Sequence, residues 1–278
     1  MRERFRFGRV TSWAVAALLL LSAAMAVIAW REARSDPATR RMSIKLPRWP
    51  ADATPVRVLV WSDMHLGNAA TTSERLARLV IEANALRPDL IILTGDYVAG
   101  HRREDAPAAV RDTAALRALR APLGVVAVMG NHEYWTDVPL VRAALERAGV
   151  VVLANTAARF GPLAVGGIDD MVNRRDNVRA TAEAARRLPG APVLLSHSPD
   201  IAPRLPDDMP LLLAGHSHCG QIVLPGYGPL VEVTQPRYRC GAVREGRRLT
   251  IVTAGTGTSV VPLRLRAPPD WWLLTLGP

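Results

Sequence analysis

The chain has 278 residues, 35 Lys and Arg against 25 Asp and Glu, a formal net charge of +10, and 49% hydrophobic residues. This hydrophobicity, with only 22% charged residues, excludes an intrinsically disordered protein, and the length suits one large domain or two small ones. The two cysteines, Cys219 and Cys240, exclude a disulfide-rich scaffold and a four-thiolate zinc site.

The positive charge is unevenly distributed along the chain. Residues 1–41 contain eight arginines against three acidic residues, so half of the net charge lies in the first seventh of the sequence. A basic protein would ordinarily suggest nucleic acid as a partner. Because the charge is concentrated beside an apolar segment, nucleic acid is not the partner we expect.

The first expected element is a transmembrane anchor over residues 10–30, preceded by a basic flank at 1–9. The segment VTSWAVAALLLLSAAMAVIAW has no charge and is long enough to cross a bilayer as a helix. The alternative interpretation is a cleaved signal peptide, with Ala24 and Ala26 as the cleavage motif. The apolar run continues to Trp30, beyond that motif, which favours an uncleaved anchor.

The arginines on both sides of this segment leave its orientation open. The short, adjacent basic flank favours a cytoplasmic N-terminus in a bacterial inner membrane, with a single pass and an extracytoplasmic catalytic domain. Residues 31–54 contain turn-forming residues and charge without periodicity, so we expect them to be a tether.

From residue 56 the sequence alternates short apolar runs with amphipathic segments, which predicts an α/β domain over residues 55–278. A βαβαβ order predicts a largely parallel sheet flanked by helices, and the chain ends in segments typical of a second, more antiparallel sheet. Buried strands are expected at 56–62, 90–96, 124–131, 150–153, 163–167, 192–196 and 210–214, and antiparallel strands within 231–243 and 247–257. Helices are expected at 73–86, 107–120, 138–148 and 177–188.

Polar side chains gather where the buried strands end. They are carboxylates, an amide and imidazoles: Asp63, His65, Asp96, Asn131, His132, Glu133, His197, His216 and His218. In open α/β sheets, ligand sites form outside the carboxyl ends of strands. Burying such groups without partners costs several kcal/mol, and a pair of divalent cations would compensate all of them together.

The donor types limit the metal. Nitrogen and oxygen ligands without a thiolate suit Mn, Fe, Zn or similar ions and disfavour a structural zinc site. A carboxylate in the middle of the set could bridge two ions. Two metals about 3.5–4 Å apart are a recurrent device for phosphoryl-ester hydrolysis.

The blocks D-x-H, G-D, G-N-H-E, a later H and G-H-x-H, in this order, resemble those of the calcineurin-like metallophosphoesterase family over about residues 56–278. The stretches LAGHSHCGQIVLP (213–225) and GTGTSVVPLR (255–264) look like its membrane-associated bacterial subfamily, which includes alternative UDP-2,3-diacylglucosamine hydrolases. Cys219 replaces the glycine expected after the second histidine, which puts an oxidisable group beside the metals.

The resemblance implies the fold and a role for each site residue. The fold is a four-layer αββα sandwich of two mixed sheets flanked by helices. One metal would bind Asp63, His65 and His218. The other would bind Asn131, His197 and His216, with Asp96 bridging. A metal-bridging hydroxide would attack phosphorus, while His132 stabilises the transition state or protonates the leaving oxygen and Glu133 orients its ring.

Three functions are compatible with this sequence. The first is a membrane-anchored dimetal phosphoesterase that hydrolyses a phosphodiester or pyrophosphate bond in a lipid-linked substrate such as UDP-2,3-diacylglucosamine. The second keeps the chemistry but takes soluble nucleotides or other phosphoesters. The third is a non-catalytic, metal-dependent binding module, which predicts damaged ligand blocks. All seven ligand positions and His132 are intact, which argues against the third.

The residues after the third block leave two interpretations open. Tyr134 and Trp135 either pack in the core or stack on a substrate base. Asp169 and Asp170 form either a turn, which we expect, or a loop that supports the metal ligands or contacts the substrate. We expect His101 to be a loop residue.

Overall fold

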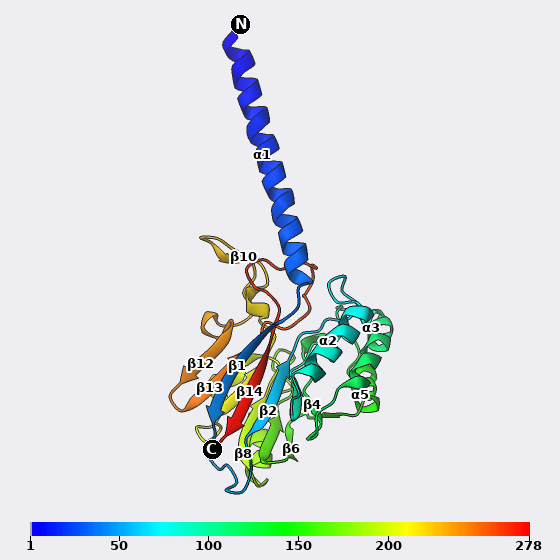
Figure 1. Ribbon diagram of the computed structural model, residues 1–278, viewed down its shortest axis with the longest axis vertical. Coiled ribbons are helices and arrows are strands. Elements are labelled where there is room, and N and C mark those ends of the chain that lie inside the picture. The colour runs from blue at the N-terminus through cyan, green and yellow to red at the C-terminus, as the bar shows by residue number, and fades with distance from the viewer. Residues whose placement is uncertain (1) are drawn as a thin grey trace.

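The computed structural model describes residues 2–278, and side chains from residue 13 onward. A long helix, α1 (Arg2–Ala33), leads into a body built on two six-stranded sheets (Figure 1). The 21 residues Trp13–Ala33 form the one described helix that is long and apolar enough to cross a membrane. Most of their side chains are exposed.

The first sheet contains the expected βαβαβ unit. Its strands, in spatial order, are β1 (Ala38–Lys45), β14 (Asp270–Gly277), β2 (Val56–Trp61), β3 (Leu90–Leu93), β4 (Val125–Ala127) and β5 (Val150–Val152). Strands β2 to β5 are parallel. Strand β14 runs antiparallel to β2 and parallel to β1, so the sheet is mixed.

The second sheet is also mixed, with a parallel centre and an antiparallel pair at each edge. Its strands, in spatial order, are β12 (Gly241–Glu245), β13 (Arg248–Val252), β9 (Leu211–Ala214), β8 (Ala191–Leu195), β7 (Leu163–Gly167) and β6 (Thr156–Phe160). A small separate hairpin pairs β10 (Val223–Leu224) with β11 (Gly228–Pro229).

Helices cover the outer faces of both sheets. The helices on the first sheet are α2 (Ser73–Ala85), α3 (Ala106–Asp112) and α5 (Val138–Arg147), with the short helices η1 (Arg103–Asp105), η2 (Thr113–Ala118) and α4 (Asn131–Trp135) nearby. Helix α6 (Val178–Arg186) and η3 (Pro199–Arg204) pack on the second sheet, and η4 (His218–Gly220) and η5 (Pro236–Tyr238) lie in the loops between β9 and β12.

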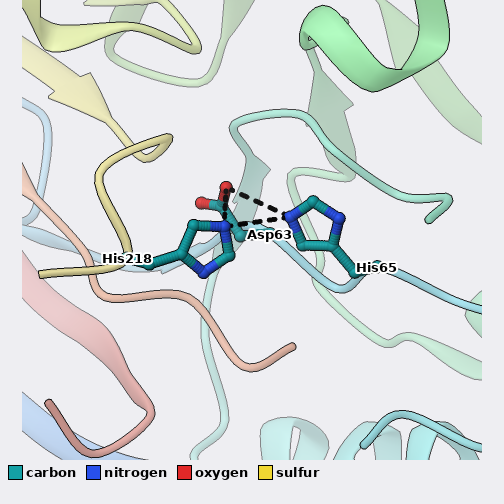
Figure 2. Close-up of side chains that lie close together, drawn as sticks. All are labelled: Asp63, His65 and His218. Atoms are coloured by element: carbon teal, nitrogen blue, oxygen red, sulfur yellow. Dashed lines mark hydrogen bonds and ion pairs between the residues drawn. The ribbon is translucent and has the colours of Figure 1, made fainter. Parts of the chain in front are cut away.

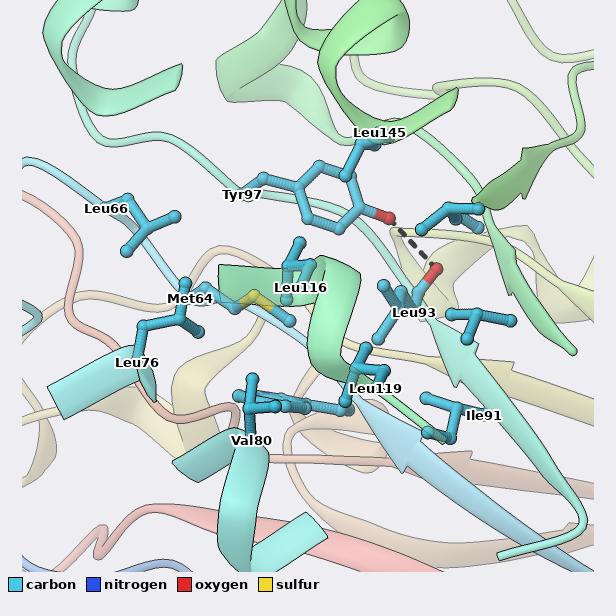
Figure 3. Close-up of a cluster of buried hydrophobic side chains, with 14 of the residues drawn as sticks. Met64, Leu66, Leu76, Val80, Ile91, Leu93, Tyr97, Leu116, Leu119 and Leu145 are labelled. Atoms are coloured by element: carbon cyan, nitrogen blue, oxygen red, sulfur yellow. Dashed lines mark hydrogen bonds between the residues drawn. The ribbon is translucent and has the colours of Figure 1, made fainter. Parts of the chain in front are cut away.

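Three apolar layers hold these elements together. Leu76 and Val80 of α2 pack with Ile91 and Leu93 of β3 in the outer layer shown in Figure 3. A second layer lies between the two sheets, and a third lies beneath α6. The predicted α/β fold with two mixed sheets flanked by helices is therefore confirmed.

The structure differs from the expected tether over residues 31–54. Residues 38–45 form β1, with Ala38 opposite Asp270 and Lys45 opposite Gly277. This strand lies at the sheet edge and is mostly exposed. Only its second half alternates, with Met42 and Ile44 packed against the layer between the sheets, and this alternation is too short to predict a strand. Helix α1 is fixed to the body as well, since Ala33 is fully buried.

Three other expectations need correction. The helix expected at 107–120 is divided into α3 and η2. Strand β6 lies outside the expected strands, and 231–243 is irregular until β12 begins at Gly241. Its turn-rich sequence contains Pro236, which cannot donate a ladder hydrogen bond.

The strand directions place α1 at the end of the body where the parallel strands terminate. Strand β1 is parallel to β14, and β14 is antiparallel to β2. The first residue of β1 therefore lies at the edge where β2, β3 and β4 end. Figure 1 shows α1 leaving from this end of the molecule.

Candidate metal centre

The nine predicted site residues meet at one end of the sandwich. They follow β2, β3 and β4 of the first sheet and β8 and β9 of the second. All are buried except His216, which is half-buried. The loops after the strands bring together two groups of ligand atoms.

The first group consists of Asp63, His65 and His218 (Figure 2). The two Nε2 atoms of the histidines lie 3.0 Å apart. Oδ1 of Asp63 lies 3.4 Å from Nε2 of His218 and 3.8 Å from Nε2 of His65. All three donor atoms therefore face one point.

The second group contains His197, His216 and Asn131. Nε2 of His197 lies 3.1 Å from Nδ1 of His216. The side-chain oxygen of Asn131 is buried without a hydrogen-bond partner. Such an orphaned acceptor is costly unless a cation or another donor satisfies it.

Asp96 joins the two groups. Its Oδ2 atom lies 3.1 Å from Nε2 of His197 and 3.6 Å from Nε2 of His65. Its other oxygen accepts the backbone N–H of His132 at 3.0 Å. That hydrogen bond orients the carboxylate so that one oxygen is shared by both groups.

These separations fit divalent cations. Two nitrogen or oxygen ligands about 2.1 Å from one ion lie about 3.0 Å apart at a right angle and about 3.4 Å apart at a tetrahedral angle. The closest donor pairs, at 3.0, 3.1 and 3.4 Å, match those values. With the unpartnered amide oxygen of Asn131, the residues present fit two cations with N and O ligands.

Backbone carbonyls orient two of the rings. Nδ1 of His197 lies 2.7 Å from the carbonyl of Thr94, and Nδ1 of His132 lies 2.9 Å from the carbonyl of Gly100. A carbonyl only accepts, so Nδ1 carries the proton in both rings. In each ring Nε2 is thereby directed toward Asp96, as in histidines that bind metals.

The loops that carry the ligands have an unusual backbone. Five of the seven predicted ligands have a left-handed conformation, which costs about 1 kcal/mol or more per non-glycine residue. They are Asp63, His65, Asp96, His216 and His218, with φ between 47° and 70°. Tightly packed neighbours maintain this strain, because a Cβ at Gly130 or Gly215 would collide with the carboxylate of Asp96 or Asp63.

Glu133 does not orient the ring of His132, contrary to expectation. Its carboxylate accepts the backbone N–H groups of Asp96, Tyr97, Val98 and Gly130. Burial and the charge of Asp96 raise the pKa of Glu133 to about 8, and the amide donors oppose this shift. Glu133 therefore fixes the loop that carries Asp96, and Gly100 takes the role expected of Glu133.

The imidazoles differ in charge because they differ in neighbours. Burial lowers the pKa of His132 to about 4 and that of His216 to about 4, so both rings are neutral at pH 7. Burial also opposes charge on His197, but the carboxylate of Asp96 raises its pKa to about 10. The carboxylate of Asp96 therefore favours positive charge beside it, and a bound cation would replace the proton on Nε2 of His197.

A cavity of about 450 Å³ opens beside the ligands. Asp96, Asn131 and His132 line its inner end. Its aromatic wall is Trp135 stacked on His101, with ring centroids 5.2 Å apart. Its other walls are largely apolar and come from 220–222, 230–231, 233 and 259–261. The sequence did not indicate these walls, because apolar residues in irregular loops show no periodicity.

The two aromatic residues after the third block have different environments. The hydroxyl of Tyr134 donates to Asp169 at 2.7 Å. The expected turn lies directly after the two aspartates, at residues 171–174. Trp135 is 38% exposed and faces the cavity. Tyr134 therefore packs against the core. Trp135 lies where it could stack on the base of a substrate.

The two cysteines form a disulfide between the loop that follows His218 and the start of β12. The oxidisable thiol expected at Cys219 is therefore paired. Nothing in the spacing of two cysteines 21 residues apart indicates this pairing, which depends on the path of the irregular segment between them.

Comparison with known proteins identifies related chains. Residues 56–220 match the family described as calcineurin-like phosphoesterase. An uncharacterized metallophosphoesterase of Aquifex aeolicus is 30% identical over 84% of this chain and 87% of its own length. The uncharacterized metallophosphoesterase YkuE of Bacillus subtilis is 30% identical over 86% of this chain and 85% of its own. A Danio rerio transmembrane protein with a metallophosphoesterase domain is 28% identical over 89% of this chain and 59% of its own.

Proposed function

Because the chain belongs to the calcineurin-like phosphoesterase family, we propose that it is a membrane-anchored enzyme that hydrolyses a phosphodiester or pyrophosphate bond in a lipid-linked substrate. The observation that carries the reaction is the carboxylate of Asp96, one oxygen of which is shared by two groups of buried ligands. The proposed domains are an anchor at 10–30 and a phosphoesterase domain at 55–278.

The ligands divide into two sets around Asp96. Asp63, His65 and His218 would hold one cation. Asn131, His197 and His216 would hold the other. When bound, two such ions activate water as a nucleophile and neutralise charge on the phosphoryl oxygens.

His132 is the proposed catalytic residue of the chain itself. Its ring is fixed through Nδ1 by Gly100, and Nε2 lies 3.9 Å from Oδ2 of Asp96 at the inner end of the cavity. In the neutral ring Nε2 is an acceptor, so these roles require the imidazolium, which the negative charge of a bound phosphoester would favour. In that form Nε2 could donate a hydrogen bond to a phosphoryl oxygen or a proton to the leaving oxygen. Ser259 lies 3.5 Å from the same nitrogen, on the cavity wall. Glu133 acts as a positioning residue for the Asp96 loop.

The membrane anchor is supported by the length and composition of Trp13–Ala33 and by the name of the Danio rerio relative. A signal sequence would have the same composition, but here the end of the helix packs on the body through Ala29 and Ala33. The Cys219–Cys240 disulfide supports an extracytoplasmic domain, because disulfides persist in oxidising compartments.

The largely apolar cavity wall supports a lipid-linked substrate. The exposed indole of Trp135, stacked on His101 beside the ligands, favours nucleotides as the second candidate substrate class. UDP-2,3-diacylglucosamine contains both chemical groups and is therefore one of the substrates to test.

The proposed reaction is tested with the full-length protein in detergent, loaded with Mn²⁺ and given methyl p-nitrophenyl phosphate. We expect metal-dependent release of p-nitrophenolate, lost at least 100-fold in Asp96→Asn and retained in Asp208→Asn. Asp208 is a suitable control because it pairs with Arg186 on the surface. Failure of the metal-loaded protein to hydrolyse any phosphodiester would contradict the proposal. A parallel assay with UDP-2,3-diacylglucosamine, phospholipids and nucleotides separates the substrate classes.

A further inference from the structure

Exposed apolar side chains on two segments form a surface that we call the apolar rim: Tyr227, Leu230, Val231, Val233, Val260 and Val261. All of them except Tyr227, which precedes Leu230 on the same segment, line the cavity. Among residues 34–278, these are six of the ten exposed large hydrophobic side chains; the others are Ile81, Trp135, Val151 and Val172. Val260 is 74% exposed and Val231 is 66% exposed. Isolated surface apolar residues need no explanation, but a contiguous group around a cavity indicates an interaction surface.

One side chain links the two segments of the rim. The amide nitrogen of Gln221 donates to the carbonyls of Ser259 and Val261, and its oxygen accepts the N–H of Ser259. The N–H of Leu230 donates to the carbonyl of Ile222, next to Gln221. The rim is therefore a supported feature of the fold.

The rim is attached to the end of the anchor. The backbone N–H of Arg264, three residues after Val261, donates to the carbonyl of Ala29 in α1 at 2.9 Å. The carboxylate of Glu32 accepts the N–H groups of Arg266 and Ala267. Figure 1 shows the β10 hairpin, which leads into the other rim segment, at the end of the body from which α1 leaves.

The residues at the end of α1 are those expected at a bilayer surface. The guanidinium of Arg34 lies over the ring of Trp30 at 3.2 Å from its centroid, and Trp30 is 40% exposed. Aromatic and basic side chains at the end of an apolar helix favour the interface. If α1 crosses a membrane, the surface of that membrane lies close to Trp30. The loop that carries Val260 lies at the same level, because it is hydrogen-bonded to Ala29 through Arg264.

We infer that the apolar rim inserts into the surface of the membrane crossed by α1, and that the cavity receives the apolar chain of a lipid phosphoester directly from that bilayer. Five of the six rim residues line the same cavity as Asp96 and His132, so the phosphate of such a lipid would reach these two residues while its chain stays on the apolar wall. This inference rests on the proposed function and states how its substrate reaches the site. The occupant of the rim is therefore lipid.

The docking is tested without any substrate. The full-length protein is placed in nanodiscs of phosphatidylethanolamine and phosphatidylglycerol, with a nitroxide at Val231→Cys, at Val260→Cys, or at Val151→Cys as control. Val151 is 44% exposed on the edge strand β5. We expect the rim labels to relax faster with oxygen, which dissolves in bilayers, than with a water-soluble nickel chelate, and the control label to show the reverse.

Two results of this measurement would overturn the inference. Rim labels as accessible to the nickel chelate as the control would mean that the rim faces water. Rim labels protected from both reagents would mean that protein, either another copy or a partner, covers the rim in place of lipid.

A matched pair of substrates gives an independent test. Methyl p-nitrophenyl phosphate is soluble, whereas hexadecyl p-nitrophenyl phosphate has the same scissile bond and resides in the bilayer. We expect the ratio of hexadecyl to methyl hydrolysis to fall at least tenfold in Val231→Asp/Val260→Asp and to be unchanged in Val151→Asp. An unchanged ratio in the rim variant would contradict the inference. If the proposed function is wrong, the unsubstituted protein would hydrolyse neither substrate. The spin-label experiment would still show whether the rim lies in the bilayer.

Discussion

The guanidinium of Arg264 lies 3.2 Å from Nδ1 of His218, and Arg264 has no exposed surface. The same guanidinium donates to the carbonyls of Ala254, Gly257 and Ala267, while the backbone of Arg264 bonds to α1. Burial lowers the pKa of Arg264 to about 10, so it stays charged at neutral pH. One residue therefore connects a predicted metal ligand, the loop that leads to the apolar rim and the end of α1.

We predict that Arg264→Met destabilises the protein strongly. Removing the guanidinium leaves several buried carbonyls without donors, at about 1–3 kcal/mol each. A total loss of about 3 kcal/mol would lower the Tm by about 6–12 °C in a domain of this size. Arg186→Met is the control, because its ion pair with Asp208 is on the surface and worth less than about 1 kcal/mol. Equal Tm shifts in detergent for the two variants would contradict this account.

Removal of metal should destabilise the folded protein, independently of activity. Buried ligand atoms that face one another at 3.0–3.1 Å lose their shared partner when the cations are removed. A ligand present at 100 times its Kd stabilises by about 2.7 kcal/mol, which corresponds to a Tm rise of about 5–10 °C. We expect Mn²⁺ to produce this rise in chelator-treated protein, and Asn131→Ala to reduce it. Identical Tm values with chelator and with Mn²⁺ would argue against the metal centre.

A substitution at His132 should separate proton donation from metal binding. We expect His132→Gln to lower kcat by about 10²–10⁴ for a poor leaving group. The loss should be smaller for p-nitrophenolate, which leaves without a proton. The Tm rise with Mn²⁺ should be the same as in the unsubstituted protein, because His132 is not a proposed ligand. If kcat falls equally for both leaving groups, His132 does not donate the proton, and its role is contact with the phosphoryl oxygens.

Glu133→Gln should show the behaviour of a positioning residue. Both oxygens of the Glu133 carboxylate accept hydrogen bonds, from four backbone N–H groups in total. Glutamine has an NH₂ group in place of one oxygen, and an NH₂ group cannot accept these hydrogen bonds. We expect lower stability and lower kcat, with the dependence on leaving group unchanged. A change in that dependence would mean that Glu133 acts on the proton transfer through His132.

The sequence predicted the site better than its surroundings. Asp63, Asp96 and Asn131 each follow an apolar run, and the carboxyl ends of parallel strands meet at one edge of a sheet. The topology therefore predicted that these residues meet. The left-handed backbone at five ligands and the contact of Arg264 with His218 depend on loop packing that has no periodic signal. The edge strand β1 was missed because its alternation is short: only Met42 and Ile44 pack against the layer between the sheets, and the first four residues of the strand are small or polar.

The disulfide gives a prediction about the membrane side. Cys219 follows His218 directly, and the bond to Cys240 closes the segment that carries Tyr227, Leu230, Val231 and Val233 of the rim. Closing a loop of this length stabilises by about 3 kcal/mol, so reduction should lower the Tm by about 6–12 °C. If the domain is extracytoplasmic, the protein taken from intact cells and denatured without reductant should react with no maleimide, and after reduction with two equivalents. A cytoplasmic domain would keep both thiols reduced. Two equivalents of maleimide before reduction would therefore reverse the proposed orientation, and Cys240→Ser, which leaves one thiol, calibrates the count.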